Sequence, residues 1–341
     1  MNNKYICKTC GKESTKNIIK IKEMMCGTKK EFEYLECDYC KSLQIKNIPQ
    51  NLEKYYNQNY YSFNPLLGII HTLIKDAHKS YFKHNLIGKI GRILTKEEPL
   101  YQILSNLHKK KEISFNSKIL DVGCGCGEFL QELNEVGFTN LNGLEPYINQ
   151  TVNKPEYKIY KNFLSNFNPN SKYDIIFLKD SFEHMDNPYE NLLKIKSLLN
   201  NNGIVIIRIP IKTEFIWNLY NINWYQLDAP RHLVTFTHKG FNQLIKRCNM
   251  KIKQTNFDSD PYMFIISEDY SRNIPMNSVN SYESFFTKNN PILRLWNMYF
   301  KKMKYKMDSK NKLTFKKLNK ITEKLNKKEN SDHAIFILTK N

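Results

Sequence analysis

The stretch that decides the fold runs from Lys118 to Leu130 and reads KILDVGCGCGEFL. An apolar segment leads into three alternating glycines, and a helical pattern of apolar and polar residues follows them. The glycines at 123, 125 and 127 let the backbone turn tightly and approach a ligand closely. The helix that begins beyond them offers unpaired backbone N–H groups. The pattern therefore predicts a strand, a glycine turn and a helix that bind a ligand.

An acidic residue, Glu145, ends the next apolar run, where a carboxylate is placed to bind ribose hydroxyls. The sequence thus indicates a nucleoside cofactor, and a glycine-rich loop without any ligand is the alternative interpretation. A dinucleotide fingerprint, G-x-G-x-x-G, needs a third small residue at the position that Glu128 occupies here. Asp121 also disfavours a phosphate, but it suits a cationic ligand that carries no phosphate, such as S-adenosylmethionine.

The run DVGCGCGEFL, followed by GLEP at 143–146, resembles the first two cofactor motifs of class I S-adenosylmethionine-dependent methyltransferases. The resemblance implies that S-adenosylmethionine is the cofactor. It also implies that the cofactor is held by residues at the ends of the first four strands of the sheet. These residues are Asp121, Gly123, Gly125, Glu145, Asn162, Lys179 and Asp180.

The chain has 341 residues and a formal net charge of +19, and only six of its 52 basic residues are arginine. Such a charge is compatible with nucleic acid, an anionic membrane surface or an acidic substrate. Because lysine is a solvated point charge and arginine is the better reader of phosphates and bases, we favour a solvated lysine-rich surface. No apolar run has membrane-spanning length and no leader region is evident, so we expect a cytoplasmic protein.

Two C-x-x-C pairs, Cys7 with Cys10 and Cys37 with Cys40, are separated by a 26-residue gap. Each pair can present two thiolates on one side of a tight turn, and the two pairs together predict a tetrahedral Zn²⁺ site in a zinc ribbon. Disulfide bonds are the alternative, which a cytosolic compartment disfavours. Four thiolates leave no open coordination position, so we expect a structural role rather than contact with a macromolecule such as RNA.

Strands and helices alternate after residue 112, which predicts an α/β fold: a Rossmann-like, doubly wound, seven-stranded sheet whose last strand is antiparallel. We expect a zinc-ribbon module at 1–46, a helical cap at 47–111 and the methyltransferase domain at 112–341. Residues 260–330 form an insertion before the last strand in this interpretation. The strands are expected near 117–122, 140–145, 157–160, 173–179, 203–209, 250–257 and 333–339.

The acceptor side is expected at the loop after the fourth strand and at the loop from Asn223 to Thr237. The second loop is rich in groups that bind ligands or accept protons. We predict catalytic roles for His232, His184 and Tyr225, and contacts with the substrate for Arg231, Trp224 and Tyr60. The chain lacks the N/D-P-P-Y motif and the Pro-Cys nucleophile of base methyltransferases, which argues against methylation of nucleic-acid bases.

Taken together, these features resemble bacterial zinc-ribbon methyltransferases that modify sugars and polysaccharides. Deoxysugar C-methyltransferases carry Y-x-E-H-L-x-Y-F-S where this chain has APRHLVTFT at 229–237, so the histidine and leucine match but the tyrosine and glutamate do not. The resemblance therefore favours O-methylation of a sugar hydroxyl, on a nucleotide sugar or a polysaccharide precursor. Alternatives are a deoxysugar C-methyltransferase, an RNA methyltransferase, a lipid or quinone methyltransferase at a membrane, and a non-catalytic adaptor. The oligomeric state is left open.

Overall fold

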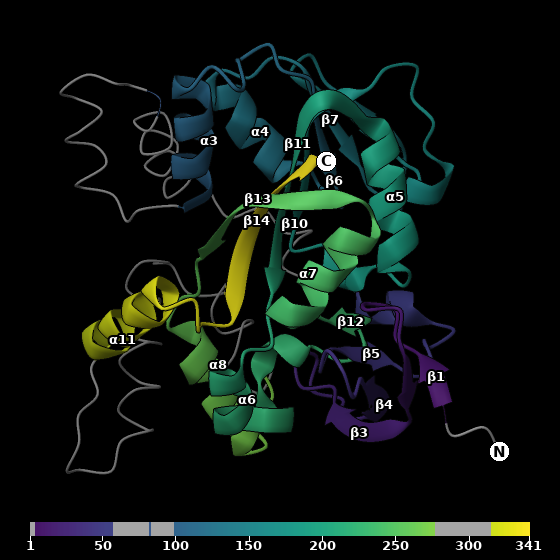
Figure 1. The fold of residues 1–341 in the computed structure, drawn as a ribbon, viewed down its shortest axis with the longest axis vertical. Coiled ribbons are helices and arrows are strands. Elements are labelled where there is room, and N and C mark those ends of the chain that lie inside the picture. Colours follow the sequence, from purple (N-terminus) through teal and green to yellow (C-terminus); the bar gives the residue numbers. More distant parts are fainter. Residues whose placement is uncertain (1–3, 57–81, 83–98, 277–314) are drawn as a thin grey trace. The chain divides into compact units, whose positions relative to one another are not determined.

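The computed structural model describes residues 4–56, 82, 99–276 and 315–341 (Figure 1). Its contacts divide the chain into two compact units. We call residues 1–55, 210–241 and 257–334 the cysteine unit, and residues 56–209, 242–256 and 335–341 the sheet unit. The division of the chain at residues 46 and 111 stays a prediction. Most of the predicted helical cap, including Tyr60, lies outside the described residues.

The sheet unit is built on an eight-stranded sheet with the order β13-β14-β11-β10-β6-β7-β9-β8. The central strands β11, β10, β6, β7 and β9 pair in parallel, and β8 pairs antiparallel with β9. The strands are β6 (Ile119–Val122), β7 (Leu141–Leu144), β8 (Val152–Asn153), β9 (Tyr157–Tyr160), β10 (Tyr173–Lys179), β11 (Leu199–Pro210), β13 (Met250–Phe257) and β14 (His333–Lys340).

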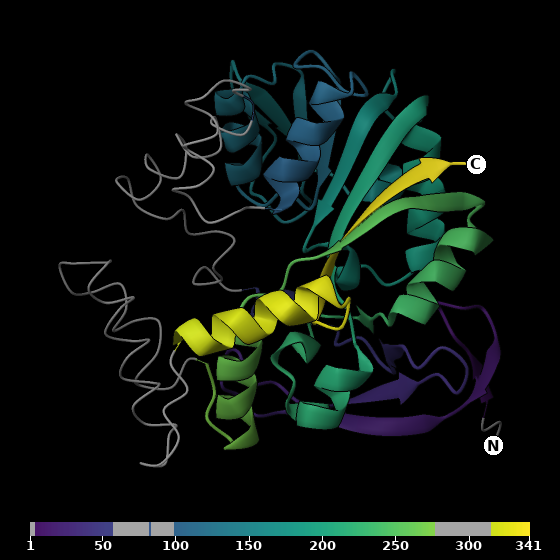
Figure 2. The same cartoon turned by 60° about the vertical axis from the view of Figure 1, so that its left-hand side comes forward.

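The prediction of a mostly parallel α/β sheet is confirmed, but its count of seven strands is short by one. The additional strand, β8, is a two-residue edge strand, too short to leave an alternating pattern in the sequence. In Figure 2 the yellow arrow of β14 points the opposite way to the teal arrows of the parallel strands, as expected for the last strand.

Helices on both sides of the strands bury the sheet. The main ones are α3 (Pro99–Lys109), α4 (Glu128–Val136), α5 (Pro188–Leu198) and α7 (His238–Arg247). Figure 1 shows α4 and α5 on opposite sides of the strands. Because both faces are covered, all four residues of β6 are buried, and β10 is buried along most of its length. In α4, Phe129, Leu130 and Leu133 recur at helical spacing and enter the same core.

The cysteine unit contains two small antiparallel sheets. One pairs β1 (Lys4–Ile6) with β2 (Glu13–Thr15), and the other has the order β12-β5-β4-β3. Its strands are β3 (Asn17–Lys22), β4 (Glu31–Glu36), β5 (Leu43–Ile45) and β12 (Val234–Thr235). β12 comes from a sequence region almost 200 residues away, and its addition to this sheet was not predicted.

The cysteine unit has a second core that includes Tyr34, Trp224 and Leu233, and residues of α6 (Glu214–Tyr220) and of the 3₁₀ turns η1 (Leu52–Tyr55) and η6 (Tyr225–Leu227) belong to it. The unit also contains η5 (Asn221–Asn223) and the helices α8 (Tyr262–Ser271) and α11 (Phe315–Lys327), and α8 buries Ile266 and Tyr270 against Met24. The helices α8 and α11 fall within the predicted insertion at 260–330. Among the described residues, no helix combines the length and the apolar character needed to cross a membrane.

Candidate functional site

The glycine turn after β6 is closely packed against neighbouring segments of the sheet unit. Gly123 has a φ of 78°, and its N–H donates to the carbonyl of Leu144 at 2.8 Å. A Cβ at this position would lie 2.5 Å from the Cβ of Ser181, whose hydroxyl donates to the carbonyl of Val122 at 2.7 Å. Only glycine satisfies both the backbone angle and the space. The turn thus brings the end of β6, the end of β7 and the loop after β10 together.

Glu145 lies directly after β7 and contacts this turn through its side chain. Its Oε2 accepts from the N–H of Gly125 at 3.1 Å, and its Oε1 accepts from the N–H of Tyr147 at 3.1 Å. Burial raises the pKa of the Glu145 carboxyl, and the two N–H groups partly oppose this shift. The carboxylate is therefore held in place beside the glycine turn, where a ribose hydroxyl is expected to bind.

Asp121, on β6, is buried with 3% of its surface exposed. Burial raises the pKa of its carboxyl to about 7, with Lys179 opposing the shift and Glu145 adding to it. The removal of a carboxylate from water disfavours its charge unless a cation is close. This electrostatic environment suits a positively charged ligand and disfavours a phosphate.

The two residues predicted at the end of β10 are placed differently. Lys179 lies with its Nζ 4.8 Å from the ring centroid of Phe129. Asp180 has a φ of 53°, and its Oδ2 accepts from Nη1 of Arg208 at 2.5 Å. Arg208, on β11, was not singled out in the sequence, because a single arginine in an apolar strand gives no motif. Cofactor binding by Lys179 and Asp180 stays a prediction.

Aromatic side chains form a row at the same edge of the sheet unit. Tyr56 stacks on Tyr147 with ring centroids 5.8 Å apart, and Tyr147 meets Phe163 edge-on at 6.1 Å. Tyr147 and Phe163 are each about half exposed. Phe163 follows the predicted Asn162, which is partly buried. The position of Tyr147 two residues after Glu145 was the available sequence signal for this row.

His184 belongs to this row as well. The hydroxyl of Tyr56 lies 3.0 Å from Nδ1 of His184, and the two rings meet edge-on. A hydrogen bond at Nδ1 fixes the orientation of the imidazole. His184 is thus a sequence-predicted residue that the structure holds near the predicted cofactor residues of the same unit.

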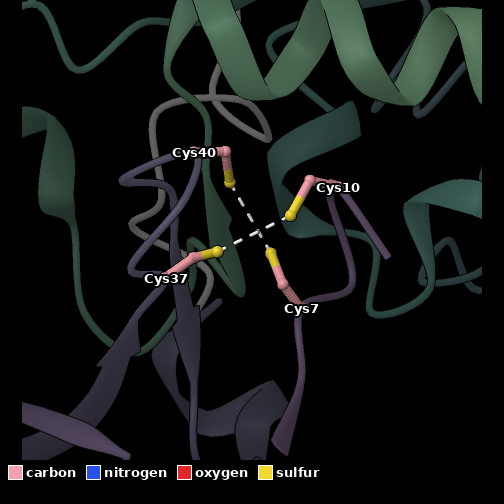
Figure 3. Close-up of side chains that lie close together, drawn as sticks. All are labelled: Cys7, Cys10, Cys37 and Cys40. Atoms are coloured by element: carbon pink, nitrogen blue, oxygen red, sulfur yellow. Dashed lines mark hydrogen bonds between the residues drawn. The ribbon is translucent and has the colours of Figure 1, made fainter. Parts of the chain in front are cut away.

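The four cysteines of the C-x-x-C pairs converge in the cysteine unit (Figure 3). All four are buried, and their sulfur atoms lie within 4.8 Å of one another. The two closest pairs are Cys7 with Cys40, at 3.7 Å, and Cys10 with Cys37, at 3.6 Å. A compact set of four thiols in two pairs is the donor set and spacing that tetrahedral Zn²⁺ requires.

The two cysteine turns have the same backbone structure. In the first, the N–H of Gly11 donates to the carbonyl of Cys7 at 2.8 Å; in the second, the N–H of Lys41 donates to the carbonyl of Cys37 at 2.9 Å. Gly11 and Lys41 both have a positive φ, of 76° and 60°. The repeated turn directs both thiols of each pair to one side, as the spacing predicted.

His232 lies in the loop between η6 and β12, with 5% of its surface exposed. Its Nδ1 is 2.7 Å from the backbone carbonyl of Gln226. Because a carbonyl oxygen only accepts, Nδ1 carries a proton, and in the neutral imidazole the lone pair is on Nε2. Nε2 lies 3.8 Å from Oδ2 of Asp228. The loop therefore fixes the tautomer that a general base would need.

Arg231 is fully buried, and its guanidinium is used within the cysteine unit. Its Nε donates to Oδ2 of Asp228 at 2.9 Å, its Nη2 pairs with the other oxygen of Asp228 and lies 3.5 Å from Glu23, and its Nη1 donates to the carbonyl of Tyr55 at 3.1 Å. Nη1 also lies 3.3 Å from Sγ of Cys26. This geometry favours a structural role, and direct contact with a substrate would require Arg231 to be uncovered.

Trp224 and Tyr225 are held in a similar way. The indole N–H of Trp224, which is 1% exposed, donates to Oδ2 of Asp332 at 2.7 Å, and burial raises the pKa of Asp332 to about 6. The hydroxyl of Tyr225 accepts from the side-chain amide of Gln226 at 2.8 Å. These contacts show the two residues supporting the loop. The catalytic and substrate-binding roles predicted for them stay predictions.

Comparison with known proteins adds the family. Residues 84–255, about half of the chain, match the model of a family described as "Methyltransferase domain". The chain belongs to this methyltransferase domain family. The match covers the glycine turn, Glu145, His184 and the loop around His232, so the prediction of a methyltransferase domain is confirmed.

The curated relatives match this chain over only part of their own length. EEF1A lysine methyltransferase 2 of Danio rerio is 41% identical over 59 residues, which cover 17% of this chain and 25% of the relative. A ubiquinone biosynthesis O-methyltransferase of Rickettsia bellii is 23% identical over 150 residues, which cover 40% of this chain and 62% of the relative. The chain thus spans less than two thirds of either protein.

The chain is also similar to solved structures. A putative sarcosine dimethylglycine methyltransferase from Galdieria sulphuraria is 14% identical, covers 70% of this chain and 84% of its own, and has a TM-score of 0.42. Coclaurine N-methyltransferase, bound to N-methylheliamine and SAH, is 12% identical, covers 86% of this chain and 84% of its own, and has a TM-score of 0.43. At these values, neither identifies a substrate.

The buried position of Arg231 predicts the result of its removal. Arg231→Ala would leave the carboxylates of Asp228 and Glu23 buried without their partner, and we expect it to lower the free energy of unfolding by about 3–5 kcal/mol. The exposed arginine Arg272, which pairs with Glu268 at 2.9 Å, provides the matched control, and Arg272→Ala is expected to cost about 0–1 kcal/mol. Urea denaturation measures both. Equal stability of the two variants would contradict the structural role.

Proposed function

We propose that this protein transfers the methyl group of S-adenosylmethionine to a hydroxyl group of a sugar. The observation that carries the cofactor is the pair of buried carboxylates, Asp121 and Glu145, on either side of a glycine turn that approaches a ligand without side chains. In this proposal Glu145 binds the ribose hydroxyls, and Asp121 pairs with the positive charge of the cofactor.

The aromatic row fits the same cofactor. Tyr147 and Phe163 follow β7 and β9, and their half-exposed rings offer apolar surface for the adenine beyond the ribose site. Asn162 offers an amide beside them. Tyr56, stacked on Tyr147, covers the ring from the other side. The sheet unit therefore supplies groups for each part of the cofactor: apolar rings, a ribose-binding carboxylate and a buried anion for the cationic end.

When bound, the cofactor supplies an activated methyl group on a sulfonium. The chain must then align the acceptor oxygen and remove its proton as the new bond forms. We assign the removal of this proton to a histidine. His232 is the first candidate because the carbonyl of Gln226 binds its Nδ1 proton, so that in the neutral imidazole Nε2 carries the lone pair. His184, oriented by Tyr56, is the second candidate. The two come from different units, and variants decide between them.

A sugar as the acceptor is supported by the resemblance of the loop at 229–237 and of the cysteine module to sugar-modifying methyltransferases. In the loop, His232 and Leu233 match the deoxysugar C-methyltransferase pattern, whereas Ala229 and Arg231 replace its tyrosine and glutamate. Because Arg231 forms internal ion pairs here, the glutamate's chemistry has no equivalent at this position. This difference favours an oxygen acceptor over carbon, and a panel of nucleotide sugars as methyl acceptors tests it.

The four clustered cysteines are proposed to bind zinc in a structural site. Their sulfur atoms already lie close together in two pairs. As thiolates, the four cysteines would complete a tetrahedral Zn²⁺ site without an additional ligand. Such a site fixes the backbone around it and performs no chemistry on the substrate.

The raised pKa of Asp121 predicts a pH-dependent affinity for the cofactor. Below about pH 7 the buried carboxyl keeps its proton, and pairing with a cation requires the proton to leave. Calorimetric titration should therefore show S-adenosylmethionine binding more tightly as the pH rises through about 7. Asp121→Asn should weaken binding by roughly tenfold or more and lose this part of the pH dependence.

Glu145→Gln provides the control for this experiment, because it should weaken binding while the pH dependence set by Asp121 remains, shifted to lower pH by the loss of the Glu145 charge. A pH profile identical in the wild type and Asp121→Asn would mean that Asp121 does not meet the cationic group.

The base assignment predicts a loss of turnover without a loss of cofactor. His232→Ala should lower kcat by on the order of 10²–10⁴ at unchanged affinity for S-adenosylmethionine, since general-base catalysis contributes this much. His184→Ala is measured beside it, and His108→Gln, on helix α3, is the control. Full turnover in both His232→Ala and His184→Ala would show that neither histidine is the base.

The zinc site predicts the metal content of the purified protein. We expect about one equivalent of zinc per chain, because four thiolates complete one tetrahedral site. Cys37→Ser should lower the content strongly, while Cys248→Ala, which removes a buried thiol of the sheet unit, should leave it unchanged. Inductively coupled plasma mass spectrometry measures both. Zinc retained at full occupancy in Cys37→Ser would exclude the four-cysteine site.

A further inference from the structure

The loop that carries His232 continues as part of the sheet of the cysteine module. β5 begins three residues after Cys40, and β12 begins two residues after His232. The two strands pair antiparallel, with Val234 opposite Gln44 and Thr235 opposite Leu43. The N–H of Ile45 also donates to the carbonyl of Leu233 at 2.9 Å. The segment that follows His232 is therefore held by β5, and β5 begins just after the second cysteine turn.

A second contact comes from β4, the strand that directly precedes the second cysteine turn. Tyr34, on β4, is fully buried and lies three residues before Cys37. Its hydroxyl donates to the backbone carbonyl of His232 itself at 2.9 Å. β4 pairs with β5 on its other side, so Tyr34 and β5 hold the same backbone segment from adjacent strands.

A third contact reaches a cysteine directly. The hydroxyl of Thr237 donates to the backbone carbonyl of Cys40 at 2.5 Å, and its N–H donates to the hydroxyl of Ser42 at 3.2 Å. Gly240 packs so closely against Ser42 and Thr9 that a side chain there would clash. The residues before and after β12 are thus hydrogen-bonded to the second cysteine turn or to the strands that flank it.

We propose that metal binding by the four cysteines positions His232, so that the metal site supports catalysis through β12 without contacting the substrate. Hydrogen bonds from Ser14 and Thr15 to Asp38 already join the segments around the two cysteine turns, and a metal held by all four sulfurs would tie the turns themselves together. Loss of that tie frees the start of β5 and the carbonyl of Cys40, and with them the segment from Leu233 to Thr237. The link to turnover rests on the proposed function of His232, whereas the structural coupling does not.

Hydrogen–deuterium exchange of the full-length protein tests the coupling directly. The zinc-loaded protein is compared with protein from which the metal was removed by a chelator. We expect exchange of the amides at 233–237 to become about tenfold faster or more, since their hydrogen bonds are lost in the opened state. Exchange in β6 and β7 of the sheet unit is the internal reference and should stay the same. Unchanged protection of 233–237 after confirmed metal removal would overturn the proposal.

A variant that keeps every cysteine guards against general unfolding of the chelated protein. Tyr34→Phe removes the hydroxyl that holds the carbonyl of His232 and leaves the ring in the core. We expect it to retain zinc and cofactor affinity, to lower kcat by roughly fivefold to tenfold, and to shift the NMR signals of the His232 imidazole. The matched control is Tyr101→Phe, which removes the hydroxyl of another buried tyrosine, one that donates to Glu132 in the sheet unit.

The outcomes separate this inference from the proposed function. If Tyr34→Phe and Tyr101→Phe give the same His232 signals, the positioning role of the module is wrong. If the His232 signals and the exchange of 233–237 respond to the metal but turnover does not depend on His232, the positioning is correct and the base assignment fails.

Discussion

The structure of the sheet unit depends on the close approach of the glycine turn to its neighbours. Gly123 lies against Ser181, and Gly143 lies against Cys124, where an added Cβ would be 2.5 Å from the sulfur. This packing excludes water from the ends of β6 and β7, and the carboxyl groups of Asp121 and Glu145 are buried there as a result. Buried carboxylates disfavour the folded protein unless they are compensated, so the site gains from a cationic ligand. In the proposed function, the cationic cofactor provides this compensation.

The cysteine unit follows a related principle with a different compensating group. Its four-stranded sheet buries apolar side chains such as Phe32, Tyr34 and Leu43, but two of its four strands are only two or three residues long. Short strands give too few hydrogen bonds to fix a register by themselves. Four thiols in two repeated turns provide the missing restraint once a metal joins them, and the segment with His232 benefits because it supplies one of the short strands.

Much of this arrangement could be predicted from local sequence. The glycine turn, the position of Glu145 after the second strand and the spacing of Cys7, Cys10, Cys37 and Cys40 are short-range patterns, and each is present as expected in the structure. β8 and β12 were missed because two residues carry no periodicity, and β12 pairs with a strand almost 200 residues away. Tyr56 was missed because its partners, Tyr147 and His184, come from two other loops.

The loop from Asn223 to Thr237 shows why polar density alone misleads. Trp224, Asp228 and Arg231 were all compatible with a ligand, since sequence does not reveal which polar groups meet one another. In the fold, Arg231 is neutralised by Asp228 and Glu23, and Trp224 meets Asp332. An irregular loop in a protein core must satisfy its own polar groups, and these pairs do so. Asp228, which pairs with Arg231, also lies 3.8 Å from Nε2 of His232, so a residue that satisfies the polar groups of the loop also holds the proposed base.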